Sequence, residues 1–212
     1  MRVLILGGGI GGLGLALGLG RRGVACEVHE RTREYKAAGA AITLWPNGLA
    51  ALRRLDGGAC LRRVLAAGHE IVSSSIRRTD GRELSRTPVQ AACEAHGLPA
   101  LAIHRAALQR AMLESLSEAP VLARRCIAVR TERHAATAVF HDWSEARADL
   151  VVGADGLSSV ARAYVTGMHE APRSLGFSLW RGTRELDDAA LRAGHAFETW
   201  AEDVRPGEGM RF

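Results

Sequence analysis

The stretch that decides the fold spans residues 3–22 and reads VLILGGGIGGLGLALGLGRR. It carries no charge from Val3 to Gly20, a length that a transmembrane helix or a signal sequence could also have. Eight of these eighteen residues are glycine, and each glycine inside a helix costs about 1 kcal/mol relative to alanine. No small-residue cleavage pattern precedes the charged pair that follows. The stretch is therefore predicted to form a strand, a glycine-rich turn and a helix.

The segments around the glycines have the periodicities of a strand–helix–strand unit. Residues 2–7, RVLILG, suit a strand buried on both faces of a parallel sheet. Apolar or small residues then recur at helical spacing, at Leu13, Ala16, Leu17 and Gly20. Gly23 is expected to end this helix, and residues 24–30, VACEVHE, to form the second strand. Such a unit within about 30 residues begins the doubly wound α/β folds that bind nucleotides.

Gly7, Gly9 and Gly12 form the pattern G-x-G-x-x-G between the first strand and the helix. The first glycine allows a tight turn, the second lets backbone approach a diphosphate, and the third lets helix and strand pack closely. The helix N-terminus also favours an anion. Glu30 ends the second strand, where a carboxylate can accept hydrogen bonds from adenosine ribose hydroxyls and would repel a 2′-phosphate. The alternative for Glu30 is a solvated acid paired with Arg31.

The rest of the chain predicts an α/β fold in which a mostly antiparallel layer interrupts the parallel, nucleotide-binding layer. Residues 40–58 begin extended and become helical near Pro46, and Asp80-Gly81 marks a hairpin within residues 69–87. Further segments are expected as a helix at 102–119, strands at 125–132 and 136–143, a strand, turn and helix at 148–165, and strands at 173–186, 195–202 and 207–212.

Composition narrows the function classes. The net charge is +5, and Lys36 is the only lysine beside 27 arginines. The arginines occur as scattered pairs instead of one basic stripe, so a nucleic-acid partner is not favoured. The histidines and four cysteines show no metal-ligand spacing, and no G-x-S-x-G elbow is present. Without an export signal or C-x-x-C pair, we expect reduced thiols and a cytoplasmic location.

Asp155 and Gly156 follow a buried strand, at the edge where open α/β sheets bind ligands. The alternative is a helix cap, because Asp155, Ser158 or Ser159 could each bind the first backbone N–H groups of the next helix. From this stretch alone, the cap is favoured.

Four segments together resemble a known family. They are GGGIGGLGLALGLGRRGVACEVHER (7–31), AGAAITLWPNGLAAL (38–52), IHRAALQRAML (103–113) and ADLVVGADGLSSVAR (148–162). In order and spacing they resemble the FAD-dependent aromatic-ring monooxygenases of the para-hydroxybenzoate hydroxylase type. The segment GAAITLWPNG is especially similar to the salicylate, hydroxybenzoate and urate hydroxylase branch. The resemblance covers most of residues 1–165.

The resemblance implies a set of cofactor-binding residues. The three glycines would hold the FAD diphosphate, and Glu30, with Arg31 beside it, would bind the adenosine ribose. Arg105 matches an arginine that reaches the diphosphate and ribityl region. Its alternative is an exposed helix charge, but helical spacing puts Arg105 on one face with apolar residues, which argues for burial. Asp155 and Gly156 match a motif tied to flavin binding and NAD(P)H use. Arg162 lies in that motif, and a surface role is equally consistent.

The resemblance also implies the chemistry and the domains. NADH or NADPH would reduce FAD, and dioxygen would then supply the oxygen that hydroxylates a small aromatic or heteroaromatic substrate. No catalytic acid or base is identifiable. We expect an FAD-binding domain at 1–68 and 101–170, and part of a substrate domain at 69–100 and 171–212. The candidates to line the substrate pocket are Trp45, Trp180 and Arg211. For the two tryptophans, ordinary core packing is the favoured alternative. Arg211 could pair with a substrate anion or could equally face solvent.

One family motif, a late Gly-Asp that holds the ribityl chain, has no match. Family members are nearly twice as long as this chain, so we expect a C-terminally incomplete fold, whether as a fragment, a short form or a self-associating chain. Two other functions stay open. One is a truncated or noncatalytic FAD- or ADP-binding module, and the other is an NAD-dependent dehydrogenase with the same glycine pattern.

Overall fold

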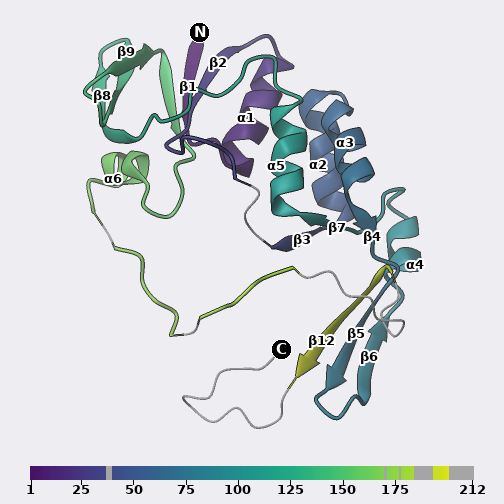
Figure 1. The fold of residues 1–212 in the computed structure, drawn as a ribbon. Helices are drawn as coiled ribbons and strands as arrows, with labels where there is room; N and C mark the ends of the chain where they lie inside the picture. Colours follow the sequence, from purple (N-terminus) through teal and green to yellow (C-terminus); the bar gives the residue numbers. More distant parts are fainter. Residues whose placement is uncertain (37–39, 170, 177, 184–192, 201–212) are drawn as a thin grey trace.

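The computed structural model describes residues 1–36, 40–169, 171–176, 178–183 and 193–200. Its elements form a mixed α/β fold with parallel and antiparallel sheets (Figure 1).

A parallel sheet lies at the centre of the fold. It contains β1 (Arg2–Leu6), β2 (Ala25–His29) and β11 (Leu150–Gly153), in the order β11-β1-β2. The four apolar residues of β1, Val3 to Leu6, are buried. Strand β1 is thus covered on both faces, as its unbroken apolar sequence predicts.

Helices cover one face of this sheet. Helix α1 (Ile10–Gly20) buries Leu13, Ala16 and Leu17, which confirms these three positions of the predicted stripe, whereas Gly20 at the helix end is exposed. It packs against α2 (Pro46–Asp56) and α5 (Arg105–Leu113), and α3 (Ala59–Ala67) completes the layer (Figure 1). The helix ends three residues before Gly23. That glycine instead takes a positive φ of 69° in the turn leading to β2.

An antiparallel sheet covers the other face. It contains β8 (Cys126–Glu132), β9 (Ala135–Phe140) and β10 (Glu145–Ala148), in the order β10-β9-β8. Leu4 and Leu6 pack against Ala138 and Phe140 between the two sheets. The first two strands confirm the predicted extended segments, whereas β10 lies outside them. The parallel sheet is therefore enclosed between helices and a second sheet.

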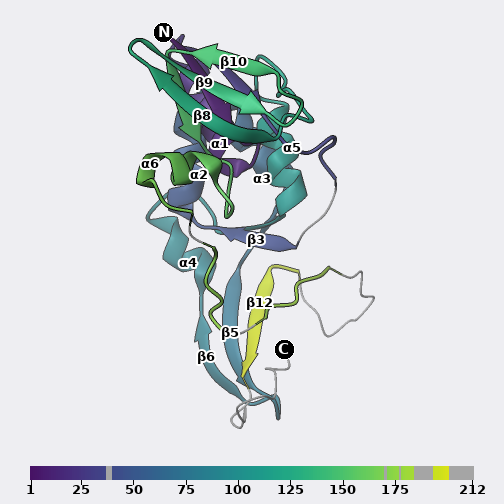
Figure 2. The same ribbon diagram turned by 90° about the vertical axis from the view of Figure 1, so that its left-hand side faces the viewer.

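Two smaller sheets lie beyond the helices. The first has the order β3-β7-β4, with β3 at Ala41–Leu44, β7 at Leu101–His104 and β4 at His69–Glu70. The second has the order β12-β5-β6, with β12 at His195–Trp200, β5 at Ser73–Arg78 and β6 at Glu83–Thr87. Figure 2 shows the second sheet extending away from the helical layer.

The predicted hairpin is confirmed, because β5 and β6 pair antiparallel around Gly81 at φ 88°. Helix α4 (Val89–Glu94) follows it. Strand β12 runs parallel to β5, so this sheet is mixed.

Three other expectations differ from the structure. The helix predicted at 102–119 is shorter, because 101–104 form β7 and the helix ends at Leu113. The strand predicted at 173–186 is absent from its described part, residues 173–176 and 178–183. The segment 207–212 lies outside the described residues, and the domain boundaries stay predictions. In the described ranges, no helix combines the length and apolar character that a membrane span requires.

Candidate functional site

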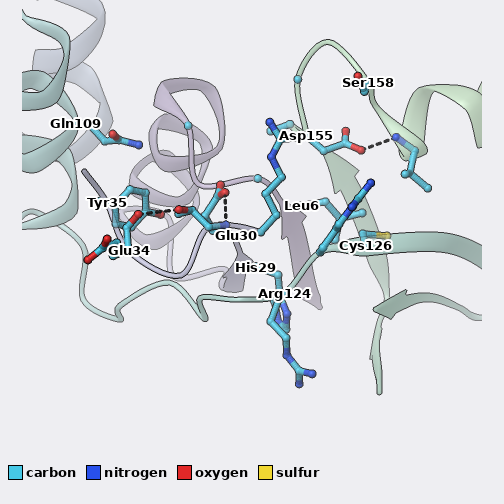
Figure 3. A pocket seen from close by; sticks show the side chains of 18 of the residues that line it. Leu6, His29, Glu30, Glu34, Tyr35, Gln109, Arg124, Cys126, Asp155 and Ser158 are labelled. Atoms are coloured by element: carbon cyan, nitrogen blue, oxygen red, sulfur yellow. Dashed lines mark hydrogen bonds between the residues drawn. The ribbon is translucent and has the colours of Figure 1, made fainter. Parts of the chain in front are cut away.

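A cavity of about 410 Å³ opens at the carboxyl ends of β1, β2 and β11. Five segments line it: the glycine-rich loop, the segment after β2, the start of α5, residues 124–126 at the start of β8, and the turn before α6 (Val160–Thr166). Figure 3 shows Glu30, Tyr35 and Gln109 on one side, and Asp155, Ser158 and Cys126 on the other. The cavity thus lies where doubly wound sheets bind their ligands.

The three motif glycines differ in the space that surrounds them. Gly7 has φ 110°, and a Cβ there would lie 2.3 Å from the carbonyl oxygen of Ala154. A Cβ at Gly12 would lie 1.9 Å from the carbonyl oxygen of Gly7. A Cβ at Gly9, the residue before α1, would meet nothing within 4 Å, and no side chain caps the helix there. Backbone packing therefore requires Gly7 and Gly12, whereas Gly9 borders open space at a helix N-terminus.

Glu30 connects the end of β2 to this loop. One carboxylate oxygen accepts a hydrogen bond from the backbone N–H of Gly8 at 2.6 Å, and the other from Thr32 at 2.9 Å. Among the ion pairs of the described residues, none joins Glu30 to Arg31, and Arg31 is exposed. The alternative of a solvated ion pair with Arg31 is therefore wrong. Both residues line the cavity.

Gln109 and Tyr35 also reach the loop, and the sequence analysis missed both. The Gln109 side-chain amide donates to the Gly8 carbonyl at 2.9 Å, across 101 residues of sequence. Gln109 lies one turn beyond Arg105 on α5, a spacing that could have identified it. The Tyr35 hydroxyl is buried and has no hydrogen-bond partner among the described residues. Burial, with a smaller contribution from the Glu30 charge, raises the pKa of Tyr35 to about 12.

Arg105 lines the cavity, but the expected burial is wrong. Leu108 and Met112 are buried on α5, whereas Arg105 is exposed. The reason is that the helix begins at Arg105, immediately after β7. Its side chain therefore borders the cavity instead of the helix core.

Asp155 caps α6, which confirms the favoured alternative. Its carboxylate accepts hydrogen bonds from the Val160 N–H at 2.7 Å and the Ser159 hydroxyl at 2.5 Å. Asp155 and Gly156, at φ 82°, also line the cavity, so the capped turn forms part of its wall. Arg162 is exposed and donates to the Leu157 carbonyl at 2.7 Å, consistent with its surface alternative.

His29, the last residue of β2, also lines the cavity and was not predicted from the sequence. Its ring is buried and stacks on Phe140, with centroids 4.8 Å apart, and Nε2 lies 2.6 Å from a Glu27 carboxylate oxygen. Arg124 lies over the same phenyl ring at 4.9 Å. Burial lowers the pKa of His29, and this outweighs the opposing effect of Glu27. The imidazole is therefore neutral near pH 7.

The charged lining favours an anionic ligand. Three acidic side chains face five basic ones in the cavity; the acids are Glu30, Glu34 and Asp155, and the bases are Arg31, Lys36, Arg105, Arg124 and Arg125. In the part of the chain that the structure describes, no cluster of His, Cys, Asp or Glu could hold a metal ion, and the four cysteines are free. The cavity can thus bind a phosphorylated ligand through backbone donors and arginines.

The substrate candidates do not meet at this cavity. Trp45 is 51% exposed and Trp180 is 92% exposed, and neither lines it. The favoured core packing is therefore wrong for both tryptophans. Arg211 lies outside the described residues.

Residues 1–202 match the protein family described as FAD binding domain. The FAD-dependent urate hydroxylase of Klebsiella oxytoca is 34% identical over 214 residues, covering 100% of this chain and 53% of that protein. The 3-amino-4-hydroxybenzoate 2-monooxygenase of Streptomyces cremeus is 39% identical over 186 residues, covering 86% of this chain and 46% of that protein.

Among solved structures, Klebsiella pneumoniae HpxO complexed with FAD and uric acid superimposes with a TM-score of 0.68 at 29% identity. The match covers 79% of this chain and 42% of that one. The chain thus spans about half the length of the curated relatives it matches.

Proposed function

The chain belongs to the FAD binding domain family, and from that premise we propose that it serves a flavin-dependent monooxygenase acting on a small aromatic or heteroaromatic compound. The reductant is NADH or NADPH, and dioxygen is the second substrate. Compounds of the class of urate and aminohydroxybenzoate are the first candidates, because the names of two relatives specify them.

One observation carries the proposal: the glycine-rich loop and the acid after β2 meet in a single cavity through the 2.6 Å Gly8–Glu30 hydrogen bond. FAD fits the residues present. The space beside Gly9 and the uncapped N-terminus of α1 suit a diphosphate, and the excess of arginines suits its charge. Glu30 suits a ribose that carries free hydroxyls.

The residues of this chain would bind and orient the cofactor. Backbone N–H groups at the start of α1 would hold the diphosphate, and Arg105 would neutralise part of its charge. Glu30 would accept hydrogen bonds from the ribose, and the Asp155 cap would keep the turn at 155–160 against the opposite side. When bound, FAD supplies the redox chemistry with the nicotinamide and dioxygen.

Cofactor binding is tested on the purified 212-residue chain. We expect a yellow protein that releases FAD on denaturation and quenches flavin fluorescence when rebound. A colourless chain that binds only ADP or NAD would favour the dehydrogenase or the ADP-binding module instead.

Hydroxylation is tested separately with ¹⁸O₂. We expect an aromatic acid or purine to stimulate NAD(P)H oxidation and one labelled oxygen atom to appear in the organic product. Oxidation that yields only hydrogen peroxide would contradict monooxygenase activity in this chain, and bound FAD with no NAD(P)H oxidation would favour a noncatalytic FAD-binding module.

A further inference from the structure

Gly8 is contacted by side chains from three different segments. Glu30 accepts a hydrogen bond from its N–H at 2.6 Å, and Gln109 donates to its carbonyl at 2.9 Å. The third contact is steric, because the Tyr35 hydroxyl lies where a side chain on Gly8 would project. Gly8 is therefore held between the end of β2, helix α5 and the segment 31–36, which we call the cavity wall.

The fit between Gly8 and Tyr35 is tight. A Cβ on Gly8 would lie 2.0 Å from the Tyr35 hydroxyl oxygen, 3.1 Å from Glu30 Cβ and 3.2 Å from Tyr35 Cζ. Gly8 does not have a positive φ, so its backbone conformation would accept alanine. The neighbouring Gly9 and Gly11 have open space at the corresponding position. The Tyr35 hydroxyl is thus the main obstacle to a larger residue at position 8, Glu30 Cβ is a weaker one, and neither Gly9 nor Gly11 is crowded in this way.

The contact between Tyr35 and Gly8 is a van der Waals contact and not a hydrogen bond. The Tyr35 hydroxyl is buried without a hydrogen-bond partner among the described residues, although burying an unpaired hydroxyl is unfavourable. The ring ends against the Gly8 backbone and lies beside Glu30. The Glu30 carboxylate also binds the N–H of Thr32 in the cavity wall. A shift of Tyr35 would therefore move the wall relative to Glu30.

We propose that Gly8 and Tyr35 are a size-matched pair that sets the position of the cavity wall against the glycine-rich loop, which makes Tyr35 a positioning residue for the bound nucleotide. The effect on the nucleotide rests on the proposed binding of FAD in this cavity. The pairing itself is a property of the folded chain. Nucleotide affinity then depends on the combined volume of residues 8 and 35, and neither side chain needs to contact the ligand.

The test is a double-mutant cycle of Gly8→Ala and Tyr35→Leu, read by FAD fluorescence quenching. We expect Gly8→Ala to weaken FAD binding about tenfold, because the new methyl group displaces Tyr35. Adding Tyr35→Leu should restore affinity to within about threefold of the Tyr35→Leu single variant. Unchanged binding in Gly8→Ala, or losses that simply add in the double variant, would overturn the proposal.

Two matched controls separate this pairing from general effects. Gly20→Ala places the same methyl group on α1 where nothing lies within 4 Å, and it should leave FAD affinity unchanged. Tyr164→Phe removes the hydroxyl of the other tyrosine, which is exposed on α6, and it should also have no effect. Tyr35→Phe should rescue Gly8→Ala only in part, because the ring carbon at 3.2 Å stays close.

A second readout does not require the cofactor. Lys36 is the only lysine of the chain, directly follows Tyr35 and has an exposed side chain. If the purification tag contains no lysine, a lysine-specific protease therefore cleaves the protein at Lys36 alone. We expect cleavage to accelerate about fivefold in Gly8→Ala and to return toward the Tyr35→Leu rate in the double variant. Equal cleavage rates in Gly8→Ala and the unmodified chain would refute the pairing.

The two readouts distinguish the possible failures. If the unmodified chain does not bind FAD, the proposed function fails, and the cleavage rates still decide whether Gly8 and Tyr35 are paired. If the chain binds FAD but Gly8→Ala changes neither affinity nor cleavage, the pairing alone is wrong.

Discussion

The carboxylate of Glu30 accepts a hydrogen bond from the backbone N–H of Gly8 at 2.6 Å, across 22 residues of sequence. This contact joins the acid after the second strand to the loop after the first. In the proposed complex with FAD, it would fix the ribose-binding acid relative to the diphosphate-binding loop.

Replacing Glu30 should weaken cofactor binding. Glu30→Ala removes the acceptor for the Gly8 and Thr32 N–H groups and for the ribose, and hydrogen bonds to charged groups contribute about 1.5–3 kcal/mol. We expect the Kd for FAD to rise at least about tenfold in a fluorescence titration. The control, Glu132→Ala, removes an exposed carboxylate on β8 that pairs with Arg147. Equal affinities for the two variants would contradict the role of Glu30.

The motif glycines should divide into two classes. Gly7→Ala and Gly12→Ala place a Cβ within 2.3 Å and 1.9 Å of backbone oxygens, so each should lower the free energy of unfolding by at least about 1–3 kcal/mol. Gly9→Ala should unfold like the unmodified chain, because space is open, but should bind FAD more weakly. Chemical denaturation combined with FAD titration checks this division. A Gly9→Ala variant with full affinity would show that no phosphate approaches that position.

Arg105 should contribute electrostatically to cofactor affinity. Its exposed side chain borders the cavity, so Arg105→Ala should raise the Kd for FAD several-fold at low salt and less at high salt. Arg110→Ala, an exposed arginine near the end of the same helix, serves as the matched control. Titrations at two ionic strengths test this, and identical salt dependences in both variants would be inconsistent with it.

His29 should make the folded state less stable in acid. Its pKa in the folded protein is lowered below 6.5 by burial, so the unfolded state binds more protons as the pH falls through that value. Stability from the neutral imidazole is complete above about pH 6.5 and is lost as the pH decreases. Denaturation between about pH 7.5 and 5 should show a smaller loss in His29→Gln than in the exposed-site control His134→Gln. Matching pH profiles would argue against His29.

The cap at Asp155 should separate stability from binding. Asp155→Ala removes the acceptor for the start of α6 and part of the cavity lining, so it should cost about 1 kcal/mol of stability and also weaken FAD binding. Ser159→Ala removes the hydroxyl that accepts from the Arg162 N–H, but Ser159 does not line the cavity. It should lower stability and weaken FAD binding less than Asp155→Ala does, because the Asp155 carboxylate stays and loses only the hydrogen bond from Ser159. Urea denaturation and FAD titration of both variants test this difference.

Several parts of the fold and site were predictable because their causes are local. The unbroken apolar run of β1, the helical stripe of α1 and the Asp80-Gly81 turn each depend on neighbouring residues. The position of Glu30 follows from strand length, since the second strand ends at the edge where the glycine-rich loop lies. The cap at Asp155 was also predictable, because a polar side chain just before a helix can bind the free N–H groups of its first turn.

Other features depended on contacts between distant segments. The exposure of Arg105 follows from the helix starting at that residue, which is decided by the pairing of 101–104 with β3 and β4. Exposure of the tryptophans likewise depends on what packs around them and has no local signature.

The sequence by itself thus determined the strand–turn–helix–strand unit and the acid that completes it, because turn chemistry and apolar periodicity act over a few residues. Only the tertiary structure decided that Gln109, 101 residues away, and Tyr35 both close on Gly8, and that His29 stacks on Phe140. Helical spacing puts Gln109 on the same side of α5 as Arg105, but its contact with Gly8 and the other contacts depend on how helices and sheets pack on one another.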